Sequence, residues 1–175
     1  MIWPFKRDPL ENDADLLVDA VNNLAISTFP KFIDEFAFIP HDERGRQYWD
    51  FVVTIAGVFI ALIGLRTLNL NKKRRLKLEK KVAACLVRLY PAIARPAFEK
   101  CKSFFDETYY DLSDAGYEPQ LIASDTIGGW VVWAILGHPA ETEQEVKLAR
   151  RVGTMIVHSF FNWWEKAGDQ KPVQT

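Results

Sequence analysis

The sequence predicts an all-α protein that consists of an amphipathic N-terminal helix, one apolar helix and a C-terminal bundle of about four helices. Two observations lead to this prediction. Apolar residues recur three and four positions apart over most of the chain, which is typical of helices that bury one face. The segment Phe51–Leu65 contains no charged residue and has apolar side chains on every side of a helix. Such a helix must be buried, either in a membrane or in the core of a protein.

The N-terminal helix is expected to begin at Asp8-Pro9, because aspartate is a favourable N-cap and proline is tolerated in the first turn. The apolar stripe that follows predicts one buried face. The helix is expected to end near Phe29-Pro30, since proline lacks the backbone N–H that a helix interior requires. A short helical stretch is expected over Lys31–Ile39, followed by a loop. Residues 1–47 are therefore predicted to form an acidic, helical N-terminal segment.

The charges of the chain are distributed unevenly. Residues 1–50 contain five basic and ten acidic residues, whereas Arg66–Lys81 contains eight basic residues and one acidic residue. A basic stretch directly after an apolar segment is the signal that keeps this side of a membrane helix in the cytoplasm. The sequence thus predicts a single-pass membrane protein with its acidic N-terminal segment on the opposite side. The other expected parts are a transmembrane helix (residues 48–70), a polybasic juxtamembrane segment (71–81), a cytoplasmic helical domain (82–167) and a flexible tail (168–175).

The predicted membrane helix is just long enough for a bilayer. Residues 48–70 would rise about 34 Å as a helix, against a hydrocarbon core of roughly 30 Å. The residues expected to anchor it are aromatic or aliphatic: Tyr48, Trp49, Phe51, Phe59 and Leu65. The residues expected to contact anionic lipid headgroups are basic and follow the helix: Arg66, Lys72, Lys73, Arg74 and Arg75.

A second interpretation makes Phe51–Leu65 the buried central helix of a soluble all-α domain. Fifteen helical residues rise only about 22 Å, a length between that of typical core helices and that of membrane spans. In this case the chain would have a ligand-binding or enzymatic role that the sequence does not reveal. A protein that docks on lipid through its basic stretch alone is a variant of this interpretation.

The C-terminal domain is predicted from four amphipathic patterns. The first begins at Leu78, the second follows Pro96, the third begins near Ser124-Asp125, and Pro139 opens the last. Cys85 and Cys101 fall on apolar stripes, so both are expected to be small core thiols in a reducing compartment.

No motif for catalysis, metal or cofactor binding is found. His138 lies close to Glu141, and Asp106-Glu107 lies close to Asp111, but neither group has the spacing of a metal site or a catalytic pair. We interpret Asp106-Glu107 and Asp111 as a solvated helix face, and Glu141 as an acid placed favourably near the positive end of a helix dipole. Gly128-Gly129 lacks the preceding strand of a phosphate-binding loop, and we interpret it as a site of close helix packing.

A partner protein or a second copy of the chain is expected to bind at exposed aromatic residues. The candidates for this interface are the four C-terminal tryptophans: Trp130, Trp133, Trp163 and Trp164. Nucleic acid is not favoured as a partner, because the basic stretch lacks interleaved aromatic residues. The sequence therefore predicts a membrane-anchored accessory or scaffold protein rather than an enzyme, with anionic lipids and a protein as its partners.

Overall fold

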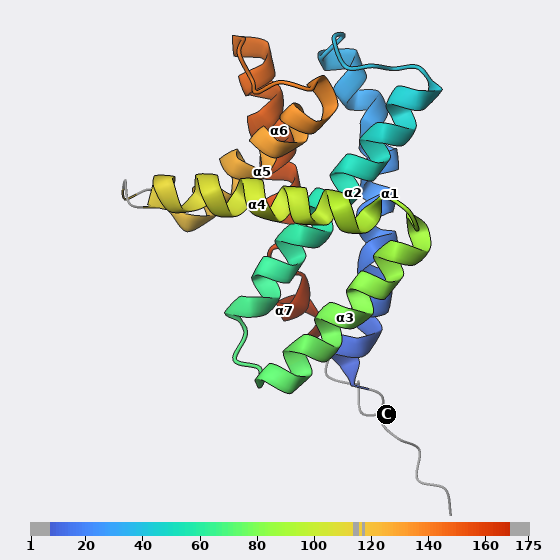
Figure 1. The fold of residues 1–175 in the computed structure, drawn as a ribbon, viewed down its shortest axis with the longest axis vertical. Helices are drawn as coiled ribbons and strands as arrows, with labels where there is room; N and C mark the ends of the chain where they lie inside the picture. Colours follow the sequence, from blue (N-terminus) through green and yellow to red (C-terminus); the bar gives the residue numbers. More distant parts are fainter. Residues whose placement is uncertain (1–7, 114–115, 117, 169–175) are drawn as a thin grey trace, which may run out of the picture.

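The computed structural model describes residues 8–113, 116 and 118–168, and the secondary structure of this part of the chain is helical (Figure 1). The prediction of an all-α fold is therefore confirmed. The helices along the described residues are α1 (Pro9–Glu35), α2 (Glu43–Thr67), α3 (Lys72–Leu89), α4 (Ala94–Ser113), α5 (Pro119–Leu136), α6 (Glu143–Phe160) and the short α7 (Trp163–Gly168).

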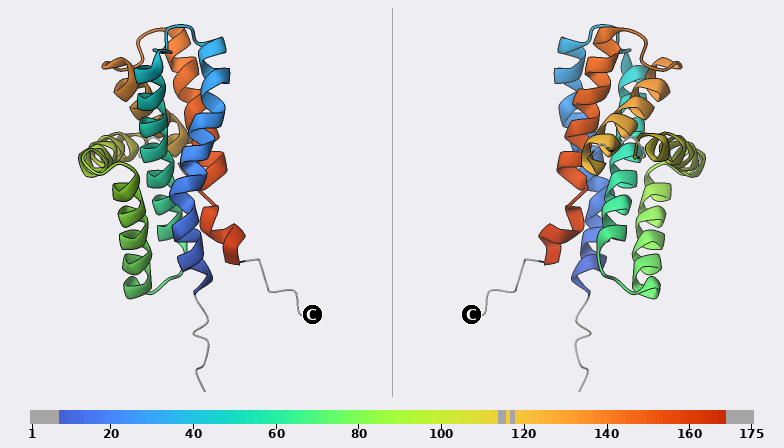
Figure 2. Two further views of the ribbon diagram at one scale, coloured as in Figure 1. Left: turned by 90° about the vertical axis from the view of Figure 1, so that its right-hand side faces the viewer. Right: turned by 90° about the vertical axis from the view of Figure 1, so that its left-hand side faces the viewer.

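The apolar helix α2 lies in the middle of the molecule and packs against each of the other helices. Figure 2 shows it with α1 and α6 to one side and α3 and α4 to the other. All residues of Phe51–Leu65 are buried except Ile63, which is partly buried. The most apolar part of α2 has a mean hydropathy of 2.0, and 83% of this segment is buried inside the fold. One helix of the described chain is thus long and apolar enough to cross a membrane, and it is also packed like the core helix of a globular fold.

Helix α1 runs alongside α2 and is longer than the sequence predicts. The Asp8 carboxylate caps it by accepting a hydrogen bond from the Leu10 N–H at 3.1 Å, as expected. The predicted end near Phe29-Pro30 is wrong, because the helix continues through Pro30 to Glu35. The separate helical stretch expected over Lys31–Ile39 is largely the end of α1.

Aromatic packing explains why α1 continues past its proline. The rings of Phe29 and Phe32 lie 5.8 and 4.9 Å from the Trp49 ring on α2, measured between centroids. The Trp49 indole N–H also donates to the carbonyl oxygen of Ala25 at 3.2 Å. These contacts lie on both sides of Pro30, so tertiary packing outweighs the loss of one helical hydrogen bond there.

Helix α3 also begins earlier than predicted. The polybasic residues expected to precede a helix beginning at Leu78 are themselves helical from Lys72 onwards. The Asn71 side chain caps this helix by accepting a hydrogen bond from the Arg74 N–H at 2.9 Å. The predicted apolar face is confirmed, because Leu78, Val82, Cys85 and Leu86 are buried. Cys85 and Cys101 are both buried with free thiols, as expected for core cysteines.

Helix α4 lies across the other helices, and the views of Figure 2 show it end-on. It is held on α2 by Phe59, whose ring lies 5.6 Å from that of Phe98 and 5.1 Å from that of Phe105. Both pairs have the edge-to-face geometry that aromatic rings favour. Because α3 runs beneath α4 rather than parallel to it, the two helices diverge from the turn that joins them (Figure 1).

Helices α5 and α6 pack along each other more extensively than any other two helices of the described chain. A Cβ atom at Gly128 would overlap the carbonyl oxygen of Ala149, and a Cβ atom at Gly153 would overlap that of Ser124. The interpretation of Gly128 as a close-packing residue is confirmed, whereas Gly129 has no atom within 3.9 Å of such a Cβ. Helix α6 begins at Glu143 rather than at Pro139, because Thr142 and Glu145 form a capping box there.

We predict opposite effects for alanine at the two adjacent glycines of α5. Gly128→Ala should destabilise the fold by about 1–3 kcal/mol, because the new methyl group forces α5 away from α6. Gly129→Ala should stabilise it by roughly 0.5–1 kcal/mol, since glycine is unfavourable inside a helix. The free energy of unfolding in urea measures both effects. Equal stabilities of the two variants would contradict the close approach of α5 and α6.

Candidate functional site

Basic residues gather at one end of the molecule, around the turn that joins α2 to α3 (Figure 1). The turn is formed by residues 68–71, and Asn71 then starts α3. The surface formed by Arg66 and the basic residues of α3 is called the basic surface below. Its side chains divide into two groups with different surroundings: Arg66, Arg74, Lys77 and Lys81 form ion pairs, whereas Lys72, Lys73, Arg75 and Lys80 form none within the described chain.

The paired group joins α3 to α1. Arg74 donates two hydrogen bonds to the Asp8 carboxylate, at 2.7 and 2.8 Å. One turn further along both helices, Lys77 pairs with Glu11, and Lys81 pairs with Asp15 at 2.9 Å in the following turn. In each of these three pairs the two partners are 66 residues apart in the sequence. Because this separation is constant, α1 and α3 run in the same direction along the row of ion pairs. The Arg74 guanidinium lowers the pKa of Asp8 below its usual value.

This ladder of ion pairs was not expected from the sequence. The sequence interpretation placed the acidic N-terminal segment and the basic stretch on opposite sides of a membrane, whereas the structure places them side by side. The sequence does contain a sign of this pairing, because Asp8, Glu11 and Asp15 have the same helical spacing as the basic residues 74, 77 and 81. Opposite charges spaced alike on two helices can pair along their whole contact.

Three members of the unpaired group lie where positive charge is least favourable. Lys72, Lys73 and Arg75 belong to the first turn of α3, which contains no acidic residue. The backbone dipole of a helix makes its N-terminus positive, so each cation there reduces stability. Lys72 and Lys73 are exposed and Arg75 is partly exposed. Within the described chain these three charges form no ion pair that would offset this cost.

The residues expected to anchor the chain in a membrane lie mostly in the protein core. Tyr48 is 45% exposed, but Trp49 is completely buried among the aromatic rings of α1. Phe51, Phe59 and Leu65 are buried too. Of the residues expected to contact headgroups, Arg74 is engaged with Asp8, and Arg66 pairs with Glu79 at 3.5 Å. Lys72, Lys73 and Arg75 have free charges.

The four tryptophans expected at a partner interface have different surroundings. Trp130 and Trp164 are buried, and the Trp164 indole N–H donates to the carbonyl oxygen of Ala61 at 2.6 Å. Trp163 is partly buried and donates to the carbonyl oxygen of Asp13 at 3.3 Å. Trp133 is 37% exposed and is stacked on Phe104, with 6.2 Å between the ring centroids. Trp133 therefore offers the most accessible indole of the four.

The candidate catalytic and metal-binding residues do not converge. The Nδ1 atom of His138 lies 2.8 Å from the carbonyl oxygen of Pro139, next to it in the chain. Glu145 bonds the backbone N–H groups of Glu141 and Thr142, and Asp106 pairs with Lys102 at 2.8 Å. The side chain of Asp111 lies outside the described residues. Within the described chain, no three His, Cys, Asp or Glu side chains are arranged to hold a metal ion.

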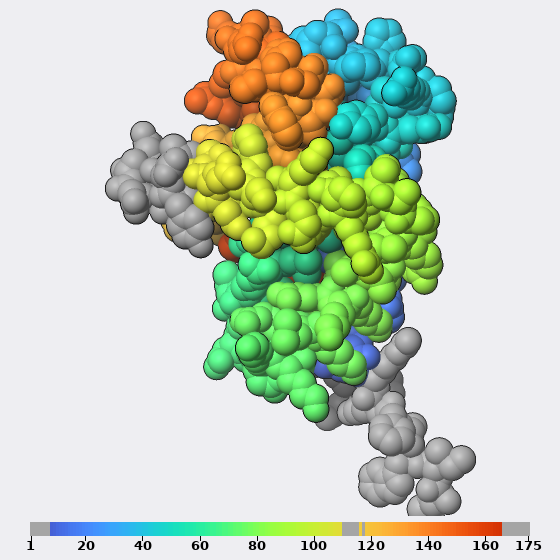
Figure 3. Space-filling view, in the orientation of Figure 1, coloured from blue at the N-terminus to red at the C-terminus, as the bar shows by residue number. Residues whose placement is uncertain are grey.

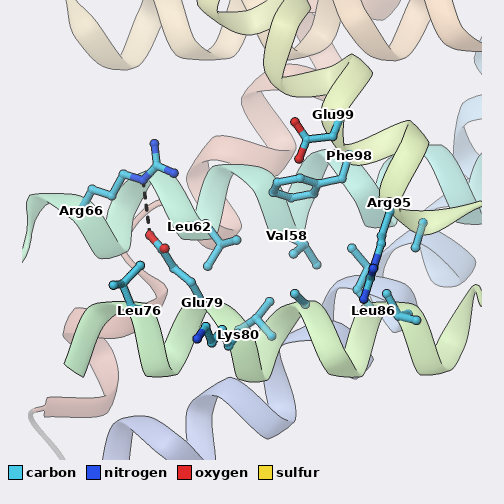
Figure 4. A pocket seen from close by; sticks show the side chains of 14 residues that line it. Val58, Leu62, Arg66, Leu76, Glu79, Lys80, Leu86, Arg95, Phe98 and Glu99 are labelled. Atoms are coloured by element: carbon cyan, nitrogen blue, oxygen red, sulfur yellow. Dashed lines mark ion pairs between the residues drawn. The ribbon is translucent and has the colours of Figure 1, made fainter. Parts of the chain in front are cut away.

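An apolar groove lies beside the basic surface, between α2, α3 and α4. The space-filling view shows α3 and α4 at the surface on this side of the molecule (Figure 3). The groove has a volume of about 490 Å³. Its floor is aliphatic and aromatic, and charged residues of all three helices stand at its rim (Figure 4). The sequence interpretation missed this groove, because it depends on the crossing angle of α4 rather than on a local pattern.

Comparison with protein-family models, with curated proteins and with solved structures finds no match to this chain.

We predict that the Asp8–Arg74 pair stabilises the fold at neutral pH and not in acid. Asp8→Asn or Arg74→Gln should each lower the free energy of unfolding, with a coupling energy of about 0.5–1 kcal/mol between them, because the pair is partly exposed. The pKa of Asp8 is lowered in the folded state, so this stabilisation is present above the unfolded pKa of aspartate and disappears as the pH falls through the lowered value. A double-mutant cycle in urea at neutral and acidic pH measures it.

Lys72→Gln is the matched control, since it removes a neighbouring charge that has no ion pair. This variant should be as stable as the unmodified chain, or more stable by roughly 0.3–1 kcal/mol, because a cation is removed from a helix N-terminus. If Lys72→Gln destabilised the fold as much as Arg74→Gln, the division of the basic surface into paired and unpaired groups would be wrong.

Proposed function

We propose that this chain is a helical accessory protein that docks on anionic membranes through Lys72, Lys73 and Arg75 of its basic surface. The observation that carries the proposal is the cluster of Lys72, Lys73 and Arg75 in the first turn of α3. These cations have no acidic partner within the described chain, and the helix dipole disfavours them. An anionic surface would remove both costs, because each basic residue close to anionic lipid contributes about 1 kcal/mol of attraction.

In this proposal α2 stays in the core while the protein is on the membrane. Helices α1 and α6 lie beside α2 and are joined by Glu35, which pairs with both Lys147 and Arg151. If the folded chain were moved into a bilayer around α2, these ion pairs and the ladder between α1 and α3 would enter the hydrocarbon, at a high cost for each charge. Docking from the surface leaves all of these charges in water.

A protein partner is the second part of the proposed role. The exposed ring of Trp133, stacked on Phe104, is the surface at which we place this contact. It lies on α4 and α5, away from the turn that joins α2 to α3 (Figure 1). A chain docked on lipid through α3 would therefore keep this aromatic pair accessible.

We predict selective binding of the full chain to anionic vesicles. The protein should sediment with phosphatidylcholine vesicles that contain phosphatidylglycerol and not with pure phosphatidylcholine vesicles, and high salt should release it. The triple variant Lys72→Gln, Lys73→Gln, Arg75→Gln should bind roughly a hundredfold more weakly, since three charges at about 1 kcal/mol each contribute about 3 kcal/mol.

The control variant loses the same amount of charge elsewhere: Arg44→Gln, Lys100→Gln and Arg150→Gln. These residues are exposed, form no ion pair within the described chain, and lie on α2, α4 and α6. Its affinity for the anionic vesicles should stay within about threefold of the unmodified chain, because charges farther than a Debye length of about 10 Å from the lipid are screened. Equal losses in the two variants would refute docking through the basic surface and leave only a general charge effect.

A single-pass span remains the second candidate function, favoured by the length and the mean hydropathy of α2. In that case the chain would have to insert α2 without its present neighbours. Extraction of membranes from cells that produce the full chain separates the two candidates. A peripheral protein is released by high salt or alkaline carbonate, whereas an integral protein stays in the pellet after both treatments.

A further inference from the structure

The groove between α2, α3 and α4 is shaped like a wedge, which is narrow at the turn between α3 and α4 and widens away from it. Helices α3 and α4 diverge from the turn at residues 90–93, and α2 passes behind the opening. At the end far from this turn, the ion pair of Arg66 on α2 with Glu79 on α3 crosses the wedge (Figure 4). A volume of about 490 Å³ lies within the range of small-molecule sites, which is roughly 300–1,000 Å³.

The floor of the groove is apolar. Val58 and Leu62 of α2 form its back wall, and Leu86 of α3 and Phe98 of α4 form its sides. Figure 4 shows the Val58 and Leu62 side chains pointing into the space between the helices. The opening persists because Phe59 supports α4 through Phe98, while the small side chain of Ala83 on α3 does not fill it. Water in such a site lacks polar partners, so an aliphatic chain would displace it favourably.

The rim of the groove favours a negative charge. It contains the cations Arg66, Lys80 and Arg95 and the carboxylates Glu79 and Glu99. Glu79 is already paired with Arg66, whereas Lys80 and Arg95 have no ion pair within the described chain. In Figure 4 the Arg95 side chain extends from α4 towards α3, while the Glu99 carboxylate stays at the side of α4. The Lys80 side chain lies on α3 nearer the Arg66–Glu79 pair, so the two unpaired cations stand at different points along the rim.

We propose that this groove binds the free anion of a single-chain fatty acid. The aliphatic chain lies against Val58, Leu62 and Phe98, and the carboxylate pairs with Arg95, whose planar guanidinium matches a carboxylate in two hydrogen bonds. Lys80 adds a second positive charge. This proposal does not depend on the proposed membrane docking, because Lys72, Lys73 and Arg75 do not line the groove.

The test uses two adjacent alanines of α3. Ala83 and Ala84 are both exposed, but only Ala83 lines the groove. The full chain is titrated with the fluorescent fatty acid 11-(dansylamino)undecanoic acid, and oleate is added as a competitor. We expect the fluorescent fatty acid to bind at one saturable site and oleate to displace it from that site. Ala83→Trp should weaken binding at least tenfold, because the indole occupies the space of the aliphatic chain, whereas Ala84→Trp should leave the affinity unchanged.

A second pair of variants tests the carboxylate. Lys80→Gln with Arg95→Gln should weaken binding of oleate by about tenfold or more, the effect expected for lost hydrogen bonds to a charged group. Lys100→Gln with Arg150→Gln removes the same charge outside the groove and should have no effect. The uncharged oleyl alcohol should compete more weakly than oleate with the unmodified chain and equally with the Lys80 and Arg95 variant.

Two further measurements separate this site from membrane docking. Ala83→Trp should sediment with anionic vesicles as the unmodified chain does, and the Lys72, Lys73 and Arg75 variant should bind oleate normally. The proposal is overturned if binding is not saturable, if Ala83→Trp and Ala84→Trp bind equally well, or if the Lys80 and Arg95 variant retains full affinity for oleate. Thermal unfolding of each variant confirms that it is folded.

Discussion

The structure depends on the burial of α2. A helix with apolar side chains on every side has no face that water can solvate, so its whole circumference must be covered. The chain meets this requirement by packing every other helix against α2. The one strongly polar side chain of Phe51–Leu65, that of Thr54, is satisfied locally by donating to the carbonyl oxygen of Asp50 at 2.6 Å. Gly57 and Gly64 let α1 and the end of α6 approach the α2 backbone closely.

The charges are arranged around this core in a way that separates folding from surface chemistry. Asp8, Glu11 and Asp15 neutralise the side of α3 that faces α1. Of the cations that remain unpaired within the described chain, Lys72, Lys73 and Arg75 lie near the turn after α2. The same short stretch of sequence therefore contributes both to the stability of the fold and to a surface of uncompensated positive charge. Composition alone cannot distinguish these two uses of a basic residue.

Much of the helical pattern could be predicted from the sequence, because helical spacing is a local property. The buried faces of α1, α3 and α6 follow from it directly. Two boundaries could not be predicted. Pro30 is a strong local signal for the end of a helix, but the packing of Trp49 against Phe29 and Phe32 outweighs it. Lys72–Arg75 has an unfavourable charge for a helix start, but the Asn71 cap and the Asp8–Arg74 pair support it.

The candidate sites were only partly visible in the sequence, for a related reason. The basic stretch could be found, but which of its members are free depends on α1, which precedes them by about sixty residues. The groove could not be found, because Val58, Leu86 and Phe98 are ordinary core residues in their own helices. They form a cavity only because α4 crosses α2 instead of running parallel to it. Non-local geometry of this kind has no signal in a single sequence.

The central position of α2 has a consequence for folding during synthesis on the ribosome. Residues 43–67 are synthesised after α1 but before all of the helices that cover their other sides. During this interval the most apolar segment of the chain is exposed, and it has the length and hydropathy of a membrane insertion signal. Two processes then compete for this nascent segment: it packs against α3–α7, or the membrane insertion machinery binds it. The outcome is decided by the order and speed of synthesis as well as by the stability of the finished fold.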